Sequence, residues 1–195
     1  MSKKINKIDV TSNTITARGG LSLFNRYIDN VRILNILQES FGHIRKSSKG
    51  LSIILIFKQV FCFIFDGTSR HISYFDHLKS DEGYAAAIEL NQSDMVSTPM
   101  IKRFFSAFGV FSMKPFRSIL HKLFLWRLHI AKPDIIEMYI DTMVMDNDDA
   151  PKRHGVQPTY KKVKGFQPLQ VIWAGKIIDA IFRGGKKMET VVILL

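Results

Sequence analysis

Cysteine is nearly absent from this sequence, because Cys62 is the only one among 195 residues. A single cysteine excludes an internal disulfide framework and a zinc site built from cysteines. Its neighbours Phe61 and Phe63 predict that Cys62 is a buried apolar residue. The six histidines show no HExxH or comparable ligand spacing, and the chain contains no GxSxG sequence. The composition and motifs therefore argue against a zinc enzyme and against a serine hydrolase of that type.

Acidic residues are too few to balance the basic ones. The chain has 28 Lys and Arg against 17 Asp and Glu, with a formal net charge of +11 and a pI near 9.8. Such a balance favours a polyanionic partner, most often nucleic acid and less often an anionic membrane surface. The alternative is that the basic residues only form solvated faces on each element.

A long uninterrupted apolar run is also missing. The most apolar segment extends from Leu51 to Phe65, but Lys58 and Gln59 lie at its centre. A membrane span needs about 20 apolar residues. We therefore expect a buried core helix at 51–65 and no stable membrane association, with a membrane-associated protein as a third functional reading. The first residues are basic but no apolar segment follows them, so no secretory signal is expected.

Two short segments resemble ligand-binding loops without their defining residues. The acidic run 146–149 has neither the glycine at the sixth position nor the closing glutamate of an EF-hand, so a solvated loop is expected. The sequence Gly184-Gly185-Lys186-Lys187 lacks the upstream glycine and the following Ser or Thr of a phosphate-binding loop. Neither segment predicts a ligand site.

The hydrophobic pattern predicts a mixed α/β chain with three parts. Residues 1–20 alternate like a short amino-terminal strand or hairpin. Residues 21–131 have helical periodicity, with apolar residues three and four apart from Leu21 to Phe41, and Ser97-Thr98-Pro99 predicts another helix entry. After Lys132-Pro133-Asp134 the runs become strand-like, and strands are expected at 135–145, 168–174 and 177–182. Residues 132–195 are therefore a second, α/β domain.

Charge is segregated along this layout. Residues 101–130 contain six Lys or Arg and no acid, residues 131–150 contain six acids and one Lys, and residues 151–187 contain nine Lys or Arg and one acid, Asp179. Basic elements thus flank a local acidic cluster, as expected for a protein that holds DNA against a carboxylate–metal site. Asp141 ends the apolar run 135–140 in the polar phase of a strand, and a carboxylate there is either solvent-facing or functional.

These features together resemble the DDE-type transposases of bacterial insertion sequences, in the group numbered thirteen-eighty. In the first part the resemblance is carried by Gly19-Gly20-Leu21, the segment Arg70 to Leu78, Ser97-Thr98-Pro99 and Arg103-Phe104-Phe105. In the second part it is carried by Ile140-Asp141-Thr142, the segment Tyr160 to Leu169 and Phe182-Arg183-Gly184-Gly185. No one motif is diagnostic, and their order and spacing carry the comparison.

The resemblance implies a helical DNA-binding domain followed by the first strands of a ribonuclease-H-like catalytic core, with Asp141 on a central strand. It implies a transposase that binds the terminal repeats and target DNA, as a homodimer in the transposition complex, in the cytoplasm with the nucleoid. Asp141 would be the first catalytic carboxylate and a ligand of Mg²⁺, within a set of three carboxylates that holds two ions. From their charge alone, Lys161, Lys162, Lys164 and Arg183 are expected to bind DNA phosphates near the active site.

The resemblance also implies that the chain lacks the second catalytic Asp and the Glu. We expect a truncated and catalytically inactive transposase, with an apolar tail at 191–195 that is prone to aggregate. We also expect limited proteolysis to leave a helical fragment that ends near Lys132. The alternative function is a non-catalytic DNA-binding regulator derived from a transposase.

Overall fold

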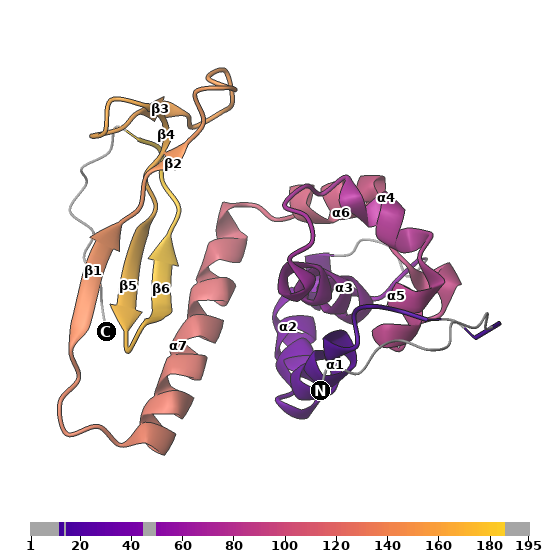
Figure 1. Cartoon of the computed structure of the whole chain (residues 1–195). Helices are drawn as coiled ribbons and strands as arrows, with labels where there is room; N and C mark the ends of the chain where they lie inside the picture. The colour runs from indigo at the N-terminus through magenta and orange to yellow at the C-terminus, as the bar shows by residue number, and fades with distance from the viewer. Residues whose placement is uncertain (1–11, 14, 45–49, 186–195) are drawn as a thin grey trace, which may run out of the picture. The chain divides into compact units, whose positions relative to one another are not determined.

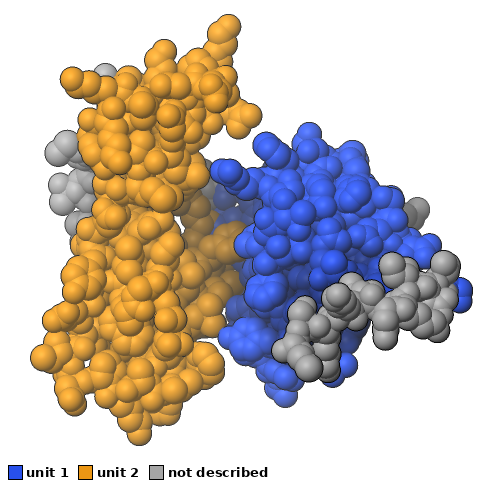
Figure 2. Space-filling view, in the orientation of Figure 1, with its two compact units in different colours: residues 1–112 blue, residues 113–195 orange. Residues whose placement is uncertain are grey.

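The computed structural model describes residues 12–13, 15–44 and 50–185 of the chain. They form two compact units, unit 1 (Met1–Ser112) and unit 2 (Met113–Leu195), which Figure 2 shows in different colours. The described residues of unit 1 are helical, whereas unit 2 combines one long helix with two small sheets (Figure 1). The predicted mixed α/β class, with helices first and strands second, is confirmed.

Six α-helices and three short 3₁₀ helices make up the described part of unit 1. The α-helices are α1 (Gly20–Asn30), α2 (Ile33–Phe41), α3 (Ile53–Asp66), α4 (Tyr74–Lys79), α5 (Glu82–Ala87) and α6 (Thr98–Ser106). The 3₁₀ helices are η1 (Gly42–Ile44), η2 (Gln92–Asp94) and η3 (Val110–Ser112). Most of the strand predicted at residues 1–20 lies outside the described residues, and residues 12–13 and 15–19 form no strand.

The helical periodicity from Leu21 to Phe41 is interrupted by a tight turn between α1 and α2. The amide of Val31 donates to the Tyr27 carbonyl and the amide of Arg32 donates to the Asp29 carbonyl. Arg32 has a φ of 55°, a left-handed conformation that a non-glycine residue adopts at some cost and that stops an α-helix. The spacing of apolar residues does not reveal this turn, because buried residues recur at intervals of three and four in both helices.

Helix α3 is a core helix, as predicted from its polar interruptions. Cys62 is fully buried within it, and burial raises the pKa of its thiol to about 12. Gln59 is also fully buried, but its amide nitrogen donates to the Leu55 and Asp94 carbonyls and its carbonyl accepts the Val96 amide proton. These hydrogen bonds satisfy a polar group that would otherwise be costly to bury, and they join α3 to the segment before α6.

No helix in the described ranges has both the length and the apolarity that a crossing of the bilayer requires. In α3 the side chain of Lys58 is only 10% exposed and lies 4.0 Å from Asp29. The charge in the middle of this helix is therefore paired within the protein fold.

Phenylalanine side chains from three helices form the centre of unit 1. The Phe57 ring lies 5.1 Å from Phe104 in an edge-to-face arrangement, and Phe108 lies 5.0 Å from Phe104 and 5.4 Å from Phe41. Such pairs add about 0.5–1.5 kcal/mol beyond the area they bury. Phe104 is a core residue, but its neighbour Phe105 is 44% exposed.

The start of α6 is capped differently from the sequence expectation. Ser97 precedes the helix and Pro99 lies in its first turn, but the Ser97 side chain makes no capping hydrogen bond. The Asp76 carboxylate of α4 instead accepts the Thr98 amide proton at 2.8 Å. This hydrogen bond lowers the pKa of Asp76. A capping residue from another helix cannot be recognised from local sequence.

Unit 2 begins with α7 (Met113–Ala131), which packs against an antiparallel sheet of order β1-β5-β6. Its strands are β1 (Met138–Thr142), β5 (Leu169–Trp173) and β6 (Lys176–Ile181). A second antiparallel sheet, of order β2-β4-β3, lies beyond one end of the first (Figure 1). Its strands are β2 (Met145–Asp146), β3 (Gln157–Pro158) and β4 (Lys164–Phe166). The long polar loop predicted at 146–165 therefore contains β3 and overlaps β2 and β4, and all three strands are too brief to show an alternating pattern.

The small core of unit 2 explains why α7 belongs with the strands. Val171, Trp173 and Ile178 are buried, and Phe124, Leu128 and Met138 pack against them. The Phe124 and Trp173 rings lie 5.5 Å apart in an edge-to-face arrangement. The domain boundary predicted from the sequence, between residues 131 and 132, follows the change from helical to strand-like pattern. The compact units of the structure instead divide between residues 112 and 113.

Candidate functional site

Asp141 lies near the end of β1, where its backbone is paired with Gln170 of β5. Alternate residues of a strand face opposite sides of the sheet. Met138 packs against the apolar core, so Tyr139 and Asp141 belong to the opposite face. The Asp141 side chain is exposed, and its Oδ1 accepts the Thr142 amide proton at 2.7 Å. The structure thus leaves the second carboxylate oxygen available to solvent or to a ligand.

The position of β1 in the sheet differs from the expected central one. In the part of the chain that the structure describes, β1 has a single neighbour, β5, and is an edge strand. The expectation of a central strand came from the resemblance, because a sequence run does not show how many neighbours a strand has. The side chains of Tyr139 and Ile140 are 60% and 62% exposed, as on an uncovered edge.

The described residues do not by themselves fit a two-metal site. No group of three or more His, Cys, Asp or Glu side chains among them could hold a metal ion. Glu137 lies just before β1 and accepts a hydrogen bond from the Tyr139 hydroxyl at 3.0 Å. Glu137 is four residues from Asp141, about 13 Å along a strand, so the two cannot share one ion.

The predicted phosphate-binding residues lie around the second sheet, not beside Asp141 on the first. Lys161 and Lys162 occupy the turn between β3 and β4, Lys164 begins β4, and all three side chains are exposed. Arg183 follows β6, and its Nε donates to the Gln167 carbonyl at 2.8 Å. The Gln167 amide donates in return to the Arg183 carbonyl. Arg183 is therefore held against the chain that leads from β4 into β5, the strand paired with β1.

The turn between β3 and β4 has a defined structure. The Thr159 amide and hydroxyl both donate to the Val163 carbonyl, at 2.8 and 2.9 Å. Lys162 has a φ of 63°, in the left-handed region that closes tight turns. Thr159 is buried and Tyr160 is exposed. These bonds hold the two lysines and the tyrosine at the surface of the second sheet.

A buried ion pair that the sequence analysis did not identify joins α7 to β6. Arg117 Nε lies 2.8 Å from Asp179 Oδ1, and Arg117 Nη2 lies 2.5 Å from Asp179 Oδ2. The Asp179 side chain is only 4% exposed, and His121 Nε2 is 3.7 Å from Oδ2. The hydrogen bonds from Arg117 lower the pKa of Asp179 and raise that of Arg117. Asp179 therefore serves to hold unit 2 together.

Two sequence signals could have indicated this pair. Asp179 is the only acid among residues 151–187, and it lies in an apolar strand. Arg117 is two residues before Ile119, the buried residue of α7. A lone carboxylate in an apolar strand needs a cation, but the sequence offers many basic residues and does not show which one reaches it.

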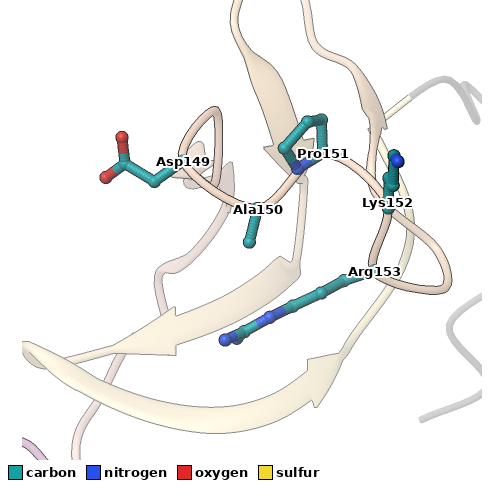
Figure 3. A pocket seen from close by; sticks show the side chains of 5 residues that line it. All are labelled: Asp149, Ala150, Pro151, Lys152 and Arg153. Atoms are coloured by element: carbon teal, nitrogen blue, oxygen red, sulfur yellow. The ribbon is translucent and has the colours of Figure 1, made fainter.

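The loop between β2 and β3 contains a hollow of about 360 Å³, lined by five consecutive residues, Asp149 to Arg153 (Figure 3). The Asp149 carboxylate and the Arg153 guanidinium do not converge on one point in this view. A ligand site normally gathers polar groups from several elements. We regard the hollow as a surface feature of the loop, in agreement with the expectation of a solvated loop at 146–149.

The chain matches no protein-family profile, no curated protein and no solved structure.

Proposed function

We propose that this chain is a DNA-binding protein of the DDE-transposase type, which contacts the phosphate backbone mainly through unit 2. One observation carries the proposal. Between residues 151 and 185 the acid Asp179 is buried in an ion pair, while Lys152, Arg153 and the three lysines of the β3–β4 region are exposed. Within this segment the positive charge is therefore presented to solvent without a surface carboxylate of its own, and an acidic contact comes from outside it, where the exposed Asp148 accepts the Lys164 amide proton. Neutralising phosphates with such residues releases counterions and favours binding.

The order of features along unit 2 supports the transposase type. Asp141 lies on a strand, a basic segment follows it, and the β5–β6 hairpin comes next. The resemblance expects this order at the opening of a ribonuclease-H-like core. In the proposal Asp141 is the first metal ligand of that core. A single carboxylate holds Mg²⁺ only weakly, since the ion keeps most of its water molecules, so the catalytic set needs further carboxylates.

Unit 1 would bind the terminal repeats of the element. The outer face of α6 exposes Lys102 and Arg103, while Ile101 and Phe104 face the core. Neither cation belongs to an ion pair among the described residues. A helix of this size fits the major groove of duplex DNA, which is about 12 Å wide. The proposal includes a homodimer in the transposition complex and a location in the cytoplasm with the nucleoid.

A salt titration tests the proposal. A fluorescently labelled duplex of about 30 base pairs is titrated with the full chain between about 50 and 200 mM salt, and binding is followed by fluorescence anisotropy. If Lys161, Lys162, Lys164 and Arg183 each neutralise one phosphate, a plot of log binding constant against log salt concentration should have a slope of about −3.6 or steeper. An Asp141→Asn variant should bind in the same way, because Asp141 lies on the first sheet. Absent or salt-independent binding contradicts the proposal.

The second candidate function is a DNA-binding regulator without catalysis. It is favoured by the single exposed carboxylate at the candidate site, where no cluster of metal ligands exists in the described ranges. Incubation with supercoiled DNA and Mg²⁺ tests the regulator. Nicking that is lost in Asp141→Asn contradicts the regulator and supports a transposase that cuts DNA, whereas binding without nicking is expected both of the regulator and of a transposase that lacks its other carboxylates.

A further inference from the structure

Two aromatic side chains of unit 2 lie outside its core, on the same part of the molecule as the basic residues. Tyr160 is 60% exposed and Phe182 is 58% exposed. The apolar cluster of the unit is built from Val171, Trp173 and Ile178 and does not include them. Large exposed aromatic side chains at a charged surface are typical of binding sites.

Both aromatic residues are fixed at opposite ends of β4. Tyr160 belongs to the turn that precedes β4, and the bonds from Thr159 to Val163 hold that turn. Phe182 lies against Phe166, the last residue of β4, with 4.9 Å between the ring centroids and an interplanar angle of 41°. A backbone bridge between Phe166 and Gly184 keeps the Phe182 segment beside β4. The two rings are thus presented by ordered backbone.

Basic residues lie next to both rings in the chain. The Lys161 ammonium lies 5.9 Å from the centroid of the Tyr160 ring. Lys162 and Lys164 are exposed nearby in the chain, and Arg183 follows Phe182 directly. We call Tyr160, Lys161, Lys162, Lys164, Phe182 and Arg183 the aromatic–basic patch. Acidic side chains lie on the β2 side of this sheet, where Asp148 accepts the Lys164 amide proton and Asp146 accepts the Asp148 amide proton. Each uses one carboxylate oxygen for this bond, and both side chains remain exposed on that side of the sheet.

We propose that the aromatic–basic patch binds single-stranded DNA, with unpaired bases stacked on Tyr160 and Phe182 and phosphates held by the cations. Phosphate contacts alone do not distinguish a duplex from a single strand. A ring can stack only on a base face that is free, and base faces inside a duplex are already covered by their neighbours. Alternation of cations and aromatic rings is therefore the combination that selects unpaired nucleotides.

This inference rests on the proposed DNA binding and makes it more specific. It assigns the β2-β4-β3 sheet to DNA in which some bases are unpaired, such as an opened or frayed element end. Base–aromatic stacking changes affinity by about 5- to 150-fold per base. Removing one ring should therefore weaken single-strand binding by a factor in that range and leave duplex binding within about twofold.

The experiment compares one DNA sequence in two forms. The full chain is titrated into a labelled 20-nucleotide single strand and into its duplex, with fluorescence anisotropy as the readout, for the Tyr160→Leu, Tyr160→Phe and Phe182→Ala variants. Tyr160→Leu keeps an apolar side chain and loses the ring, whereas Tyr160→Phe keeps the ring. The matched control is Tyr139→Leu, since Tyr139 is equally exposed, at 60%, but lies on β1. Tryptophan fluorescence, from Trp126 and Trp173 together, checks that each variant keeps the fold of unit 2.

We expect Tyr160→Leu and Phe182→Ala to weaken single-strand binding selectively, and Tyr160→Phe and Tyr139→Leu to bind as the unmodified chain does. Equal losses for both DNA forms, or no loss in either ring variant, would overturn the inference while duplex binding stands. A chain that binds neither DNA form overturns both this inference and the proposed function. Stronger binding to single-stranded RNA than to single-stranded DNA of the same sequence would overturn the assignment to DNA.

Discussion

Unit 1 and unit 2 have similar numbers of basic residues but very different cores. Among the described residues, twenty apolar side chains are buried in unit 1 and four in unit 2. Unit 1 closes its core around phenylalanines from several helices, whereas unit 2 relies on a small cluster and one buried ion pair. Burial of apolar area is the main stabilising term in folding. We infer that unit 1 is the stable scaffold and that unit 2 is the marginal part of the molecule.

The exposed apolar side chains of unit 2 also indicate that it is the less stable unit. Ile135, Tyr139 and Ile140 of the β1 region are at least 60% exposed, and Trp126 of α7 is 56% exposed. A three-stranded sheet covered on one face by a single helix buries little of its apolar surface. The two tryptophans of the chain, Trp126 and Trp173, both lie in unit 2. Tryptophan fluorescence therefore reports unit 2 alone.

Limited proteolysis should show the largest difference between the units. The division into compact units moves the expected end of the resistant helical fragment from near Lys132, as the sequence suggested, to near Ser112, with unit 2 degraded first at a low protease concentration. The fragment ends before α7 because that helix packs on β6 and is exposed when the sheet opens. Mass spectrometry of the resistant fragment measures its end. A fragment that retains α7 and ends near Lys132 would show that α7 belongs to the stable part.

Phe57→Ala tests the core of unit 1. Its ring meets Phe104 edge to face and is 5% exposed, so the substitution should destabilise unit 1 by about 3–5 kcal/mol. Circular dichroism at helical wavelengths follows this loss during urea unfolding. The matched control is Phe111→Ala, since Phe111 is 94% exposed. A shift in the tryptophan transition as large as the shift in the helical signal would mean that the units do not unfold separately.

Arg117→Ala tests the ion pair of unit 2. The substitution leaves the buried Asp179 carboxylate without its main partner. Breaking a fully buried pair costs about 3–5 kcal/mol, and we expect about 2–3 kcal/mol here because the Arg117 side chain is 33% exposed. Urea unfolding followed by tryptophan fluorescence measures the loss. Lys122→Ala on the exposed side of the same helix should change stability little, and an equal effect of the two substitutions would contradict the role of the pair.

Acid should weaken unit 2 by a smaller amount. The hydrogen bonds from Arg117 lower the pKa of Asp179 in the folded chain, so the carboxylate contributes stability above its unfolded pKa of about 3.9. That contribution is lost as the pH falls below about 4 and through the lower folded pKa. Protonation leaves a neutral carboxyl group instead of an unpaired charge, so the loss is less than in Arg117→Ala. Asp179→Asn should remove this component from the pH dependence of the tryptophan transition.

Much of the fold follows from local sequence. The apolar spacing and the entry at Thr98-Pro99 correctly indicate α3, α6 and α7, and the strand-like runs after Lys132 correspond to β1, β5 and β6. These elements are long enough to show a period of their own. The cap of α6 by Asp76 and the break at Arg32 could not be predicted, because each depends on contacts or backbone angles outside the apolar pattern.

The candidate site was only partly predictable. The sequence places Asp141 in the polar phase at the end of a strand, where it is either solvent-facing or functional, with basic residues after it. In the structure Asp141 is exposed on β1 and the lysines follow it. The sequence does not show that Asp141 and the lysines lie on separate sheets, because the strands β2 and β4 have only two and three residues. The partner of Asp179 was hidden for a related reason, since Arg117 is 62 residues away in the chain. The roles in transposition remain predictions.

The central claim is that the β3–β4 region of unit 2 binds DNA phosphates. It is tested most directly by comparing two variants that lose the same positive charge at different places in unit 2. One variant replaces Lys161, Lys162 and Lys164 with Gln, and the other replaces Lys114, Lys122 and Arg127 of α7, which are equally exposed. Both lose three positive charges. We predict that the first variant binds duplex DNA far more weakly, with a salt slope shallower by about 2.7, and that the second stays close to the unmodified chain. Equal affinities and equal slopes for the two variants would contradict the claim.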